Sequence, residues 1–331
     1  MKDWSLKWVL ICLLCFLPLA MYIHLISGQI EISYSSYFDS FFHFDSHNTN
    51  QVLVREFRLP RLFMAMIAGA GLSLSGMFMQ TLFKNPLAGP YVLGINSGAT
   101  LMIALSLLTG VQFFQSNFGL IGTALIGAFA AGLFMMIVAQ RLKSQITLLL
   151  VGLMFGSFTS AFVSILESLA GAESLKSFTM WSMGSLQQVE FSQLGIILVV
   201  FSFGILGSFL LVKPLNMLVI GEKSAALLGL PIKSVRMFVL LLTALFAGLV
   251  TAFCGPIAFV GIAIPNLTRI LFQTTNHRYL IIGNSFIGAI FLLLTDAFIQ
   301  LLEGHLSIPL NALTSIIGAP FVVFLLMRKL R

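Results

Sequence analysis

The chain has 331 residues, of which 58% are hydrophobic and only 9% are charged, and its mean hydropathy is +1.02. These proportions exclude a soluble globular domain, because such domains carry about 25% charged residues. The sequence therefore predicts a protein for which the lipid bilayer is the main solvent.

Windows without charged residues predict ten membrane-spanning helices, each close to the ~20 residues needed to cross a bilayer. The first apolar run lacks a clear small-x-small cleavage site, so we interpret it as a retained helix. Residues 85–140 contain no Asp, Glu, Lys or Arg and leave room for two helices, whereas the run 237–268 is broken at Gly255-Pro256. The predicted spans are 8–30, 62–83, 93–110, 117–140, 145–166, 191–212, 236–253, 257–272, 279–302 and 308–327.

The distribution of Lys and Arg predicts the orientation of these spans. With the N-terminus inside, 14 of the 18 basic residues lie on the inner face and four on the outer face, which is a strong positive-inside bias. The net charge of +7 then reflects membrane topology, and no nucleic-acid partner is needed to explain it. Both termini are predicted to be cytoplasmic. The larger segments outside the bilayer are external at about 31–57 and 167–190, and cytoplasmic at about 213–236.

The cytoplasmic segment contains the sequence GEKSAALLGLPIKSVR, which predicts a short helix that faces water. Glu222 falls in its first turn, where the helix dipole favours an anion. Gly229 falls where a C-terminal glycine ends a helix, and Pro231 prevents its continuation. So short a helix is not stable alone in water, and we expect it to rest on a partner protein.

Few residues can carry chemistry. Asp296 is the one carboxylate placed inside a predicted membrane span, about two turns from its outer end, and Gln300 lies one turn further on the same face. A structural or docking role is favoured over ion coupling, because a single carboxylate near an interface is a poor proton relay. His43 and His47 are open to a metal or haem contact, although solvated loop histidines are far commoner. No phosphate-binding loop, catalytic triad or metal-ligand cluster occurs, so we expect no cofactor, no metal and no enzymatic activity in this chain.

Six segments between about Arg58 and Leu326 resemble the permease subunits of ATP-binding-cassette importers for iron-siderophores, haem and cobalamin, of the FecCD type (type II importers). One segment would be weak evidence, but six in the right order across ten spans are highly specific. They are RLPR at 58–61, NPLAGPYVLGINSGA at 85–99, WSMGSL at 181–186, GEKSAALLG at 221–229, GPIAFVGIAIPN at 255–266 and IPLNALTSIIGAPF at 308–321.

The resemblance implies one all-α permease domain over residues 1–331, which forms a homodimer around a central pathway in the cytoplasmic (inner) membrane of a bacterium. Two cytoplasmic ATPase subunits would supply ATP and Mg, and an external or periplasmic binding protein would deliver an iron chelate, haem or cobalamin. A secondary transporter or channel that works alone is the alternative, and it would need buried charges beyond Asp296. A membrane enzyme is disfavoured by the lack of a converging catalytic set.

The resemblance also implies roles for particular residues. Arg58 and Arg61 match arginines that face acidic residues of the binding protein, and Arg55 extends this external positive cluster; anionic lipid headgroups are the alternative partner. The residues that match the inner mouth of the pathway are Asn85, Pro86 and Leu87; a rigid turn fixed by Pro86 is the alternative. The residues that match the ATPase-docking helix are Gly221, Glu222, Ala225, Leu228 and Gly229.

Several positions depart from the family pattern. Asn266 stands where a histidine is usual, Gln300 where an arginine is usual, and Gly89 where an acidic residue is common. Residues 307–311, Ser-Ile-Pro-Leu-Asn, replace the usual Glu-Leu-Pro-x-Gly. Three of these changes lie at or near the outer ends of the last two spans, so we expect docking or delivery on that side to differ.

Overall fold

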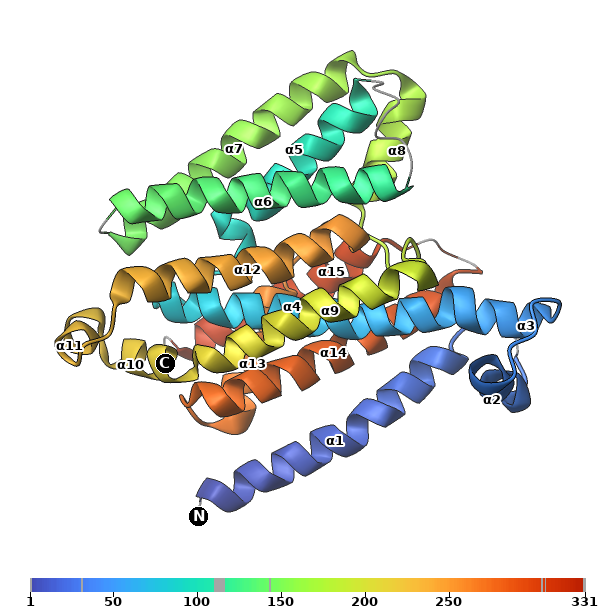
Figure 1. The fold of residues 1–331 in the computed structure, drawn as a ribbon, viewed down its shortest axis with the longest axis horizontal. Coiled ribbons are helices and arrows are strands. Elements are labelled where there is room, and N and C mark those ends of the chain that lie inside the picture. The colour runs from blue at the N-terminus through green and yellow to red at the C-terminus, as the bar shows by residue number, and fades with distance from the viewer. Residues whose placement is uncertain are drawn as a thin grey trace.

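The computed structural model describes residues 2–30, 32–109, 117–142, 144–304, 306 and 308–329. Within these ranges every regular element is a helix, and the long helices pack into one bundle (Figure 1). They are α1 (Lys2–Ile26), α2 (Tyr34–Phe42), α3 (Thr49–Val52), the π-helix η1 (Leu53–Arg58), α4 (Leu59–Phe83), the 3₁₀-helix η2 (Pro90–Leu93), α5 (Ile95–Leu108), α6 (Asn117–Arg141), α7 (Gln145–Leu169), α8 (Ala172–Ser182), α9 (Phe191–Leu210), α10 (Val212–Ile220), α11 (Glu222–Leu227), α12 (Ile232–Cys254), α13 (Val260–Phe272), α14 (His277–Leu302) and α15 (Leu310–Lys329).

Helix α4 forms the centre of the bundle. Of its 25 residues 22 are buried, and it contacts α14, α12, α13 and α9. Figure 1 shows it running between α12 and α14, with α1 on the outer side of α14. A helix that is apolar on all sides is stable only where other helices surround it, which fits this central place.

Close helix approach depends on glycines that face one another. A Cβ atom at Gly76 would lie 1.7 Å from the carbonyl oxygen of Gly261 on α13, and one at Gly69 would lie 2.0 Å from that of Gly288 on α14. Small residues allow such contact between backbones, which drives helix association in lipid. A buried polar contact supplements it, because the Ser73 hydroxyl donates to Asn284 Oδ1 at 2.7 Å.

Helices α5, α6 and α7 form an outer group that packs against α12 through α6 (Figure 1). On α7 one face is apolar and is not covered by the described residues, so that Phe158 is 66% exposed. The same is true of α15, where Ile316 is 67% exposed. In a membrane protein such faces meet lipid or another subunit.

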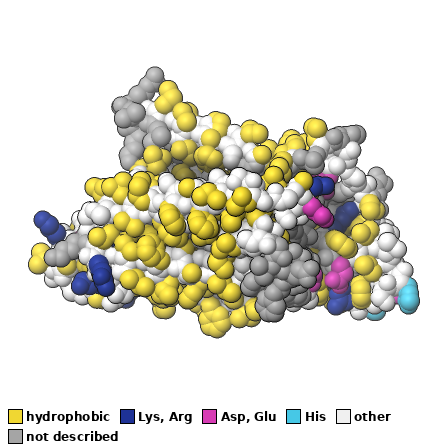
Figure 2. Space-filling view, turned by 90° about the horizontal axis from the view of Figure 1, so that it is seen from above, with side chains coloured by type: hydrophobic (Ala, Val, Ile, Leu, Met, Phe, Trp, Pro, Cys, Tyr) yellow, Lys and Arg dark blue, Asp and Glu magenta, His cyan; other side chains and the backbone are white. Residues whose placement is uncertain are grey.

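The surface has the distribution of side chains expected of a membrane-embedded bundle. Figure 2 shows hydrophobic side chains across the middle of one face, with charged side chains gathered at its two ends. Seven helical stretches are long and apolar enough to cross a membrane, and three shorter apolar helices accompany them in the described part of the chain. The shorter ones are Ile95–Leu108, Val260–Phe272 and Leu310–Phe324.

Short helices occupy the segments predicted to lie between spans. Helices α2 and α3 lie within 31–57, η1 continues one residue beyond it to Arg58, α8 lies within 167–190, and α10 precedes α11. Windows without charge could not reveal them, because these helices are short or carry polar residues. Below, "the α2 end" of the bundle is the end where α2 and α3 lie, and "the α11 end" is the end where α10 and α11 lie (Figure 1).

Candidate functional site

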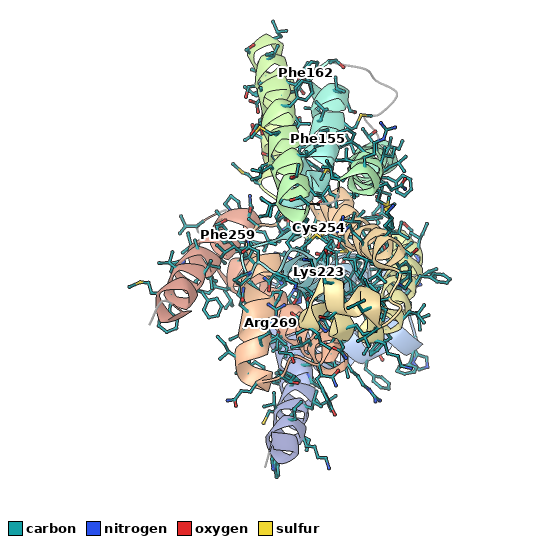
Figure 3. The ribbon with its side chains drawn as sticks, turned by 90° about the vertical axis from the view of Figure 1, so that its left-hand side faces the viewer. Phe155, Phe162, Lys223, Cys254, Phe259 and Arg269 are labelled. Carbon is teal, nitrogen blue, oxygen red and sulfur yellow. The ribbon has the colours of Figure 1, made fainter. Side chains whose placement is uncertain are left out.

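Helix α11 presents apolar side chains to solvent at the α11 end. Leu227 is 90% exposed and Leu228 is 65% exposed, whereas Ala225 is fully buried against the bundle. Figure 3 looks onto this end, where Lys223 marks the helix. Exposed leucines beside a lysine, outside the apolar belt, are typical of a surface that a partner protein covers.

A glycine stop gives α11 its shape. The N–H of Leu230 donates to the carbonyl of Ala225 at 3.0 Å, and the N–H of Gly229 donates to that of Ala226 at 3.0 Å. These two bonds form a Schellman motif, which needs a left-handed residue after the helix. Gly229 has a φ of +84°, a conformation that L side chains rarely adopt. The exposed leucines are therefore held in one orientation.

Two of the predicted ATPase-docking residues make contacts within this chain. The Glu222 carboxylate forms an ion pair with Arg236 at 3.1 Å, and Ala225 packs inward. Gly221 begins the helix with a φ of +132°, and it lies beside the end of α4, because a Cβ there would be 3.9 Å from Lys84 Nζ. Leu228 and Gly229 are left on the open surface.

The loop of Asn85, Pro86 and Leu87 follows α4 at this same end. Lys84 ends α4 with a φ of +49°, and the N–H of Leu87 donates to Asn85 Oδ1 at 2.9 Å. Asn266 on α13 holds the loop, since its Nδ2 donates to the carbonyl of Pro86 at 2.8 Å. Leu87 is 38% exposed. The asparagine that departs from the family pattern thus fixes the predicted inner-mouth loop to α13.

A buried polar network lies toward the α2 end. Asp296 on α14 is 2% exposed, and Arg61 binds both of its oxygens, with Nε at 2.7 Å from Oδ2 and Nη2 at 3.0 Å from Oδ1. His24 Nε2 lies 2.7 Å from Oδ2, and Gln300 Nε2 donates to the same oxygen at 3.1 Å. A carboxylate removed from water needs such partners, and together they join α1, α4 and α14.

Sequence reasoning found Asp296 and Gln300 but missed their partner His24. The signal was available, because His24 is an ionisable residue inside an otherwise apolar predicted span, and such residues usually have a buried partner. Glu303 was missed as well: its Oε1 accepts from Arg61 Nη2 at 2.7 Å and from Gln187 Nε2 at 2.6 Å. The network therefore extends to the loop between α8 and α9.

The three arginines predicted to dock a binding protein have different surroundings. Arg61 is only 12% exposed. Arg58 donates to the carbonyls of Leu25 and Ile30 and to the Tyr37 hydroxyl, so it fastens the chain that leaves α1. Arg55 is 34% exposed and stacks over two aromatic rings, with its guanidinium carbon 4.2 Å from the centre of the Phe44 ring and 5.0 Å from that of Phe191.

Two clefts flank Arg61 at the α2 end. The larger has a volume of about 540 Å³ and its lining includes Phe57, Arg58, Gln187, Gln300 and Glu303. The smaller, of about 220 Å³, lies toward α8 and the start of α15 and includes Met180, Met183, Gln187, Pro309 and Leu310.

The other residues that differ from the family pattern lie in different environments. A Cβ at Gly89 would come 3.0 Å from Ile262 Cγ1, so this position has no room for an acidic side chain without a shift of Ile262. Asn311 Oδ1 accepts from the N–H of Ala258 at 3.0 Å, which ties the start of α15 to the break before α13. Ser307 lies outside the described residues.

His43 and His47 are exposed near the end of α2. Among the described residues, no group of three or more His, Cys, Asp or Glu side chains lies close enough to hold a metal ion. A metal or haem contact at these two histidines stays an untested hypothesis.

Residues 14–328 match the FecCD transport family. The chain is 33% identical to the hemin transport system permease protein HmuU of Yersinia pestis, with 82% of each chain covered. It is 32% identical to the vitamin B12 import system permease protein BtuC of Shigella boydii, over 99% of this chain and 97% of that one. A solved structure described as an inward-facing conformation of a metal-chelate type ABC transporter superposes with a TM-score of 0.86 at 29% identity, covering 97% of this chain and 99% of that one. The chain therefore belongs to the FecCD transport family and is a membrane permease of the ABC transporter class.

Proposed function

We propose that this permease imports a bulky metal chelate, such as an iron-siderophore, haem or cobalamin, across the cytoplasmic membrane of a bacterium. The observation that carries the proposal is α11, a short helix with exposed Leu227 and Leu228 at one end of an apolar bundle. A sequence without a phosphate-binding loop cannot hydrolyse ATP by that route, so the motor is a separate ATPase. Helix α11 is the surface on which that ATPase docks, as a helix in a groove.

The proposed topology has ten spans with both termini in the cytoplasm. It counts the seven long apolar stretches and the three shorter apolar helices. The positive-inside bias places α11 and the loop of Asn85, Pro86 and Leu87 in the cytoplasm and the α2 end outside. ATP and Mg belong to the ATPase, and this chain holds no cofactor.

The proposed assembly contains two copies of this chain, two ATPase subunits and an external binding protein. The open apolar faces of α7 and α15 support a second copy as their partner, because exposed side chains such as Phe158 and Ile316 gather there. The α2 end, with Arg55, Arg58 and Arg61, is the side on which the binding protein docks. Exposed ion pairs give only ~0–1 kcal/mol each, but several together orient an encounter.

The decisive experiment compares uptake into liposomes that contain this chain with and without its ATPase. Chelate uptake should require the ATPase, ATP and Mg, and a non-hydrolysable ATP analogue should stop it. Uptake of equal rate without the ATPase would favour a transporter or channel that works alone. Competition among ferric siderophore, haem and cobalamin in the same liposomes identifies the substrate.

A further inference from the structure

Two buried polar clusters join the α10–α11 segment (Val212–Leu227) to the rest of the chain. The first, here called the arginine joint, consists of Glu222, Arg236 and the carbonyl of Leu142. Arg236 Nη2 donates to Glu222 Oε1 at 3.1 Å, and Nη1 donates to the carbonyl of Leu142 at 3.1 Å. Arg236 is 7% exposed. The joint therefore links α11 to α12 and to the end of α6.

The second cluster, here called the histidine joint, consists of Asn216, His277 and Thr81. Asn216 Oδ1 accepts from the backbone N–H of His277 at 2.9 Å and lies 2.8 Å from its ring Nδ1. His277 Nε2 lies 3.0 Å from Thr81 Oγ1, and the imidazole is 1% exposed. The joint therefore links α10 to the start of α14 and the end of α4.

Hydrogen-bond accounting fixes the direction of the histidine joint. The backbone N–H of His277 can only donate, so the Asn216 atom that it meets is an acceptor oxygen. The ring Nδ1 facing the same oxygen must carry the proton. Nε2 lies within hydrogen-bond distance of the Thr81 hydroxyl, which itself donates to the carbonyl of Met77 at 2.9 Å. Apolar packing of Leu215 and Leu218 is non-directional, whereas these bonds fix how α10 sits on the bundle.

We propose that the two joints transmit the movement of the α10–α11 segment to the spanning helices. This proposal rests on the proposed function, in which the ATPase binds the exposed side of α11. The arginine joint passes that movement to α6 and α12, and the histidine joint passes it to α4 and α14. Arg236 and Asn216 are thus positioning residues. Neither belongs to the exposed surface that the ATPase would contact, and both couple the movement of the α10–α11 segment to the spanning helices.

The test measures ATPase binding, ATP hydrolysis and chelate uptake in the same liposomes, for the full assembly. Arg236→Met and Asn216→Leu should keep ATPase binding and lower the uptake per ATP hydrolysed by about tenfold. Arg236→Met leaves the Glu222 carboxylate without its cation, and Asn216→Leu leaves the buried His277 imidazole without its acceptor. Asn216→Asp keeps the acceptor oxygen and should retain most of the coupling. Lys233→Gln, which changes an exposed lysine on α12 one turn before Arg236, is the matched control and should behave as the unmodified chain.

Glu222→Gln guards against variants that fail to fold, because Glu222 is 30% exposed and the change is isosteric. It should lower uptake per ATP by at least about threefold, since it removes the charge that faces a nearly buried guanidinium. Unchanged uptake per ATP in Glu222→Gln together with Asn216→Leu would overturn the proposal. An unmodified chain without ATPase-dependent uptake would instead refute the proposed function, so the two failures are distinguishable.

Discussion

Replacing Gly76 with alanine should weaken the contact between α4 and α13 at its closest point. The new Cβ would lie 1.7 Å from the carbonyl oxygen of Gly261. A comfortable C···O contact is about 3.3–3.6 Å, so the two helices must separate by roughly 1.5 Å or more. Because the obstacle is backbone, no side-chain rotation relieves the clash.

Two contributions determine how far Gly76→Ala lowers the free energy of unfolding. Overpacking a well-packed interior costs about 1–3 kcal/mol where side chains can adjust, and a backbone obstacle places this site at or above the upper value. Separation would also stretch the hydrogen bond from Gln80 Nε2 to the carbonyl of Ile262, now 3.1 Å, which contributes about 0.5–1.5 kcal/mol. We expect the free energy of unfolding to fall by about 3 kcal/mol or more.

Equilibrium unfolding by SDS in mixed micelles measures this free energy, and Gly195→Ala is the matched control. Gly195 lies inside α9, and apart from the backbone of its own helix no described atom lies within 4 Å of the Cβ position, so alanine there should be neutral or stabilising by up to ~1 kcal/mol. The reasoning is refuted if Gly76→Ala and Gly195→Ala unfold at the same SDS concentration as the unmodified protein.

Three further predictions concern the two ends of the bundle. Asp296→Ala should lower the free energy of unfolding by about 3–5 kcal/mol in the same titration, because it leaves the Arg61 guanidinium without its main partner; an unchanged midpoint would contradict this. Gly229→Val should disturb the left-handed stop of α11 and lower ATP-driven uptake, and normal assembly with normal transport would disprove the assignment of this segment. Leu87→Cys should react with a water-soluble maleimide at different rates in nucleotide-free and ATP-bound assemblies, while identical rates would indicate a rigid turn.

The positions of the spanning helices can largely be predicted from the sequence, because each segment in lipid must by itself be apolar and satisfy its own backbone hydrogen bonds. A backbone in hydrocarbon must satisfy its own hydrogen bonds, so charge-free windows of the right length locate the spans. The stop at Gly229 is readable for the same local reason, since Gly and Pro restrict φ at their own positions.

The partners of the polar residues could not be read in this way. Arg61 and Asp296 are 235 residues apart, and His24 is 272 residues from Asp296. Their meeting depends on how α1, α4 and α14 pack, which no local pattern encodes. The resemblance to the family therefore predicted a docking role for Arg61, and nothing local in the sequence indicated that it binds a buried carboxylate.

The position of α4 at the centre of the bundle has a consequence for biosynthesis. A ribosome adds about 5–20 residues per second, so roughly 10–50 seconds pass between the synthesis of Arg61 and that of Asp296. During that interval α4 sits in the membrane without the α14 partners of Arg61 and Gly69, which are Asp296 and Gly288. The translocon or a chaperone must therefore hold α4 until α14 has been synthesised. A ribosome stalled before α14 is complete should leave α4 exposed to membrane proteases.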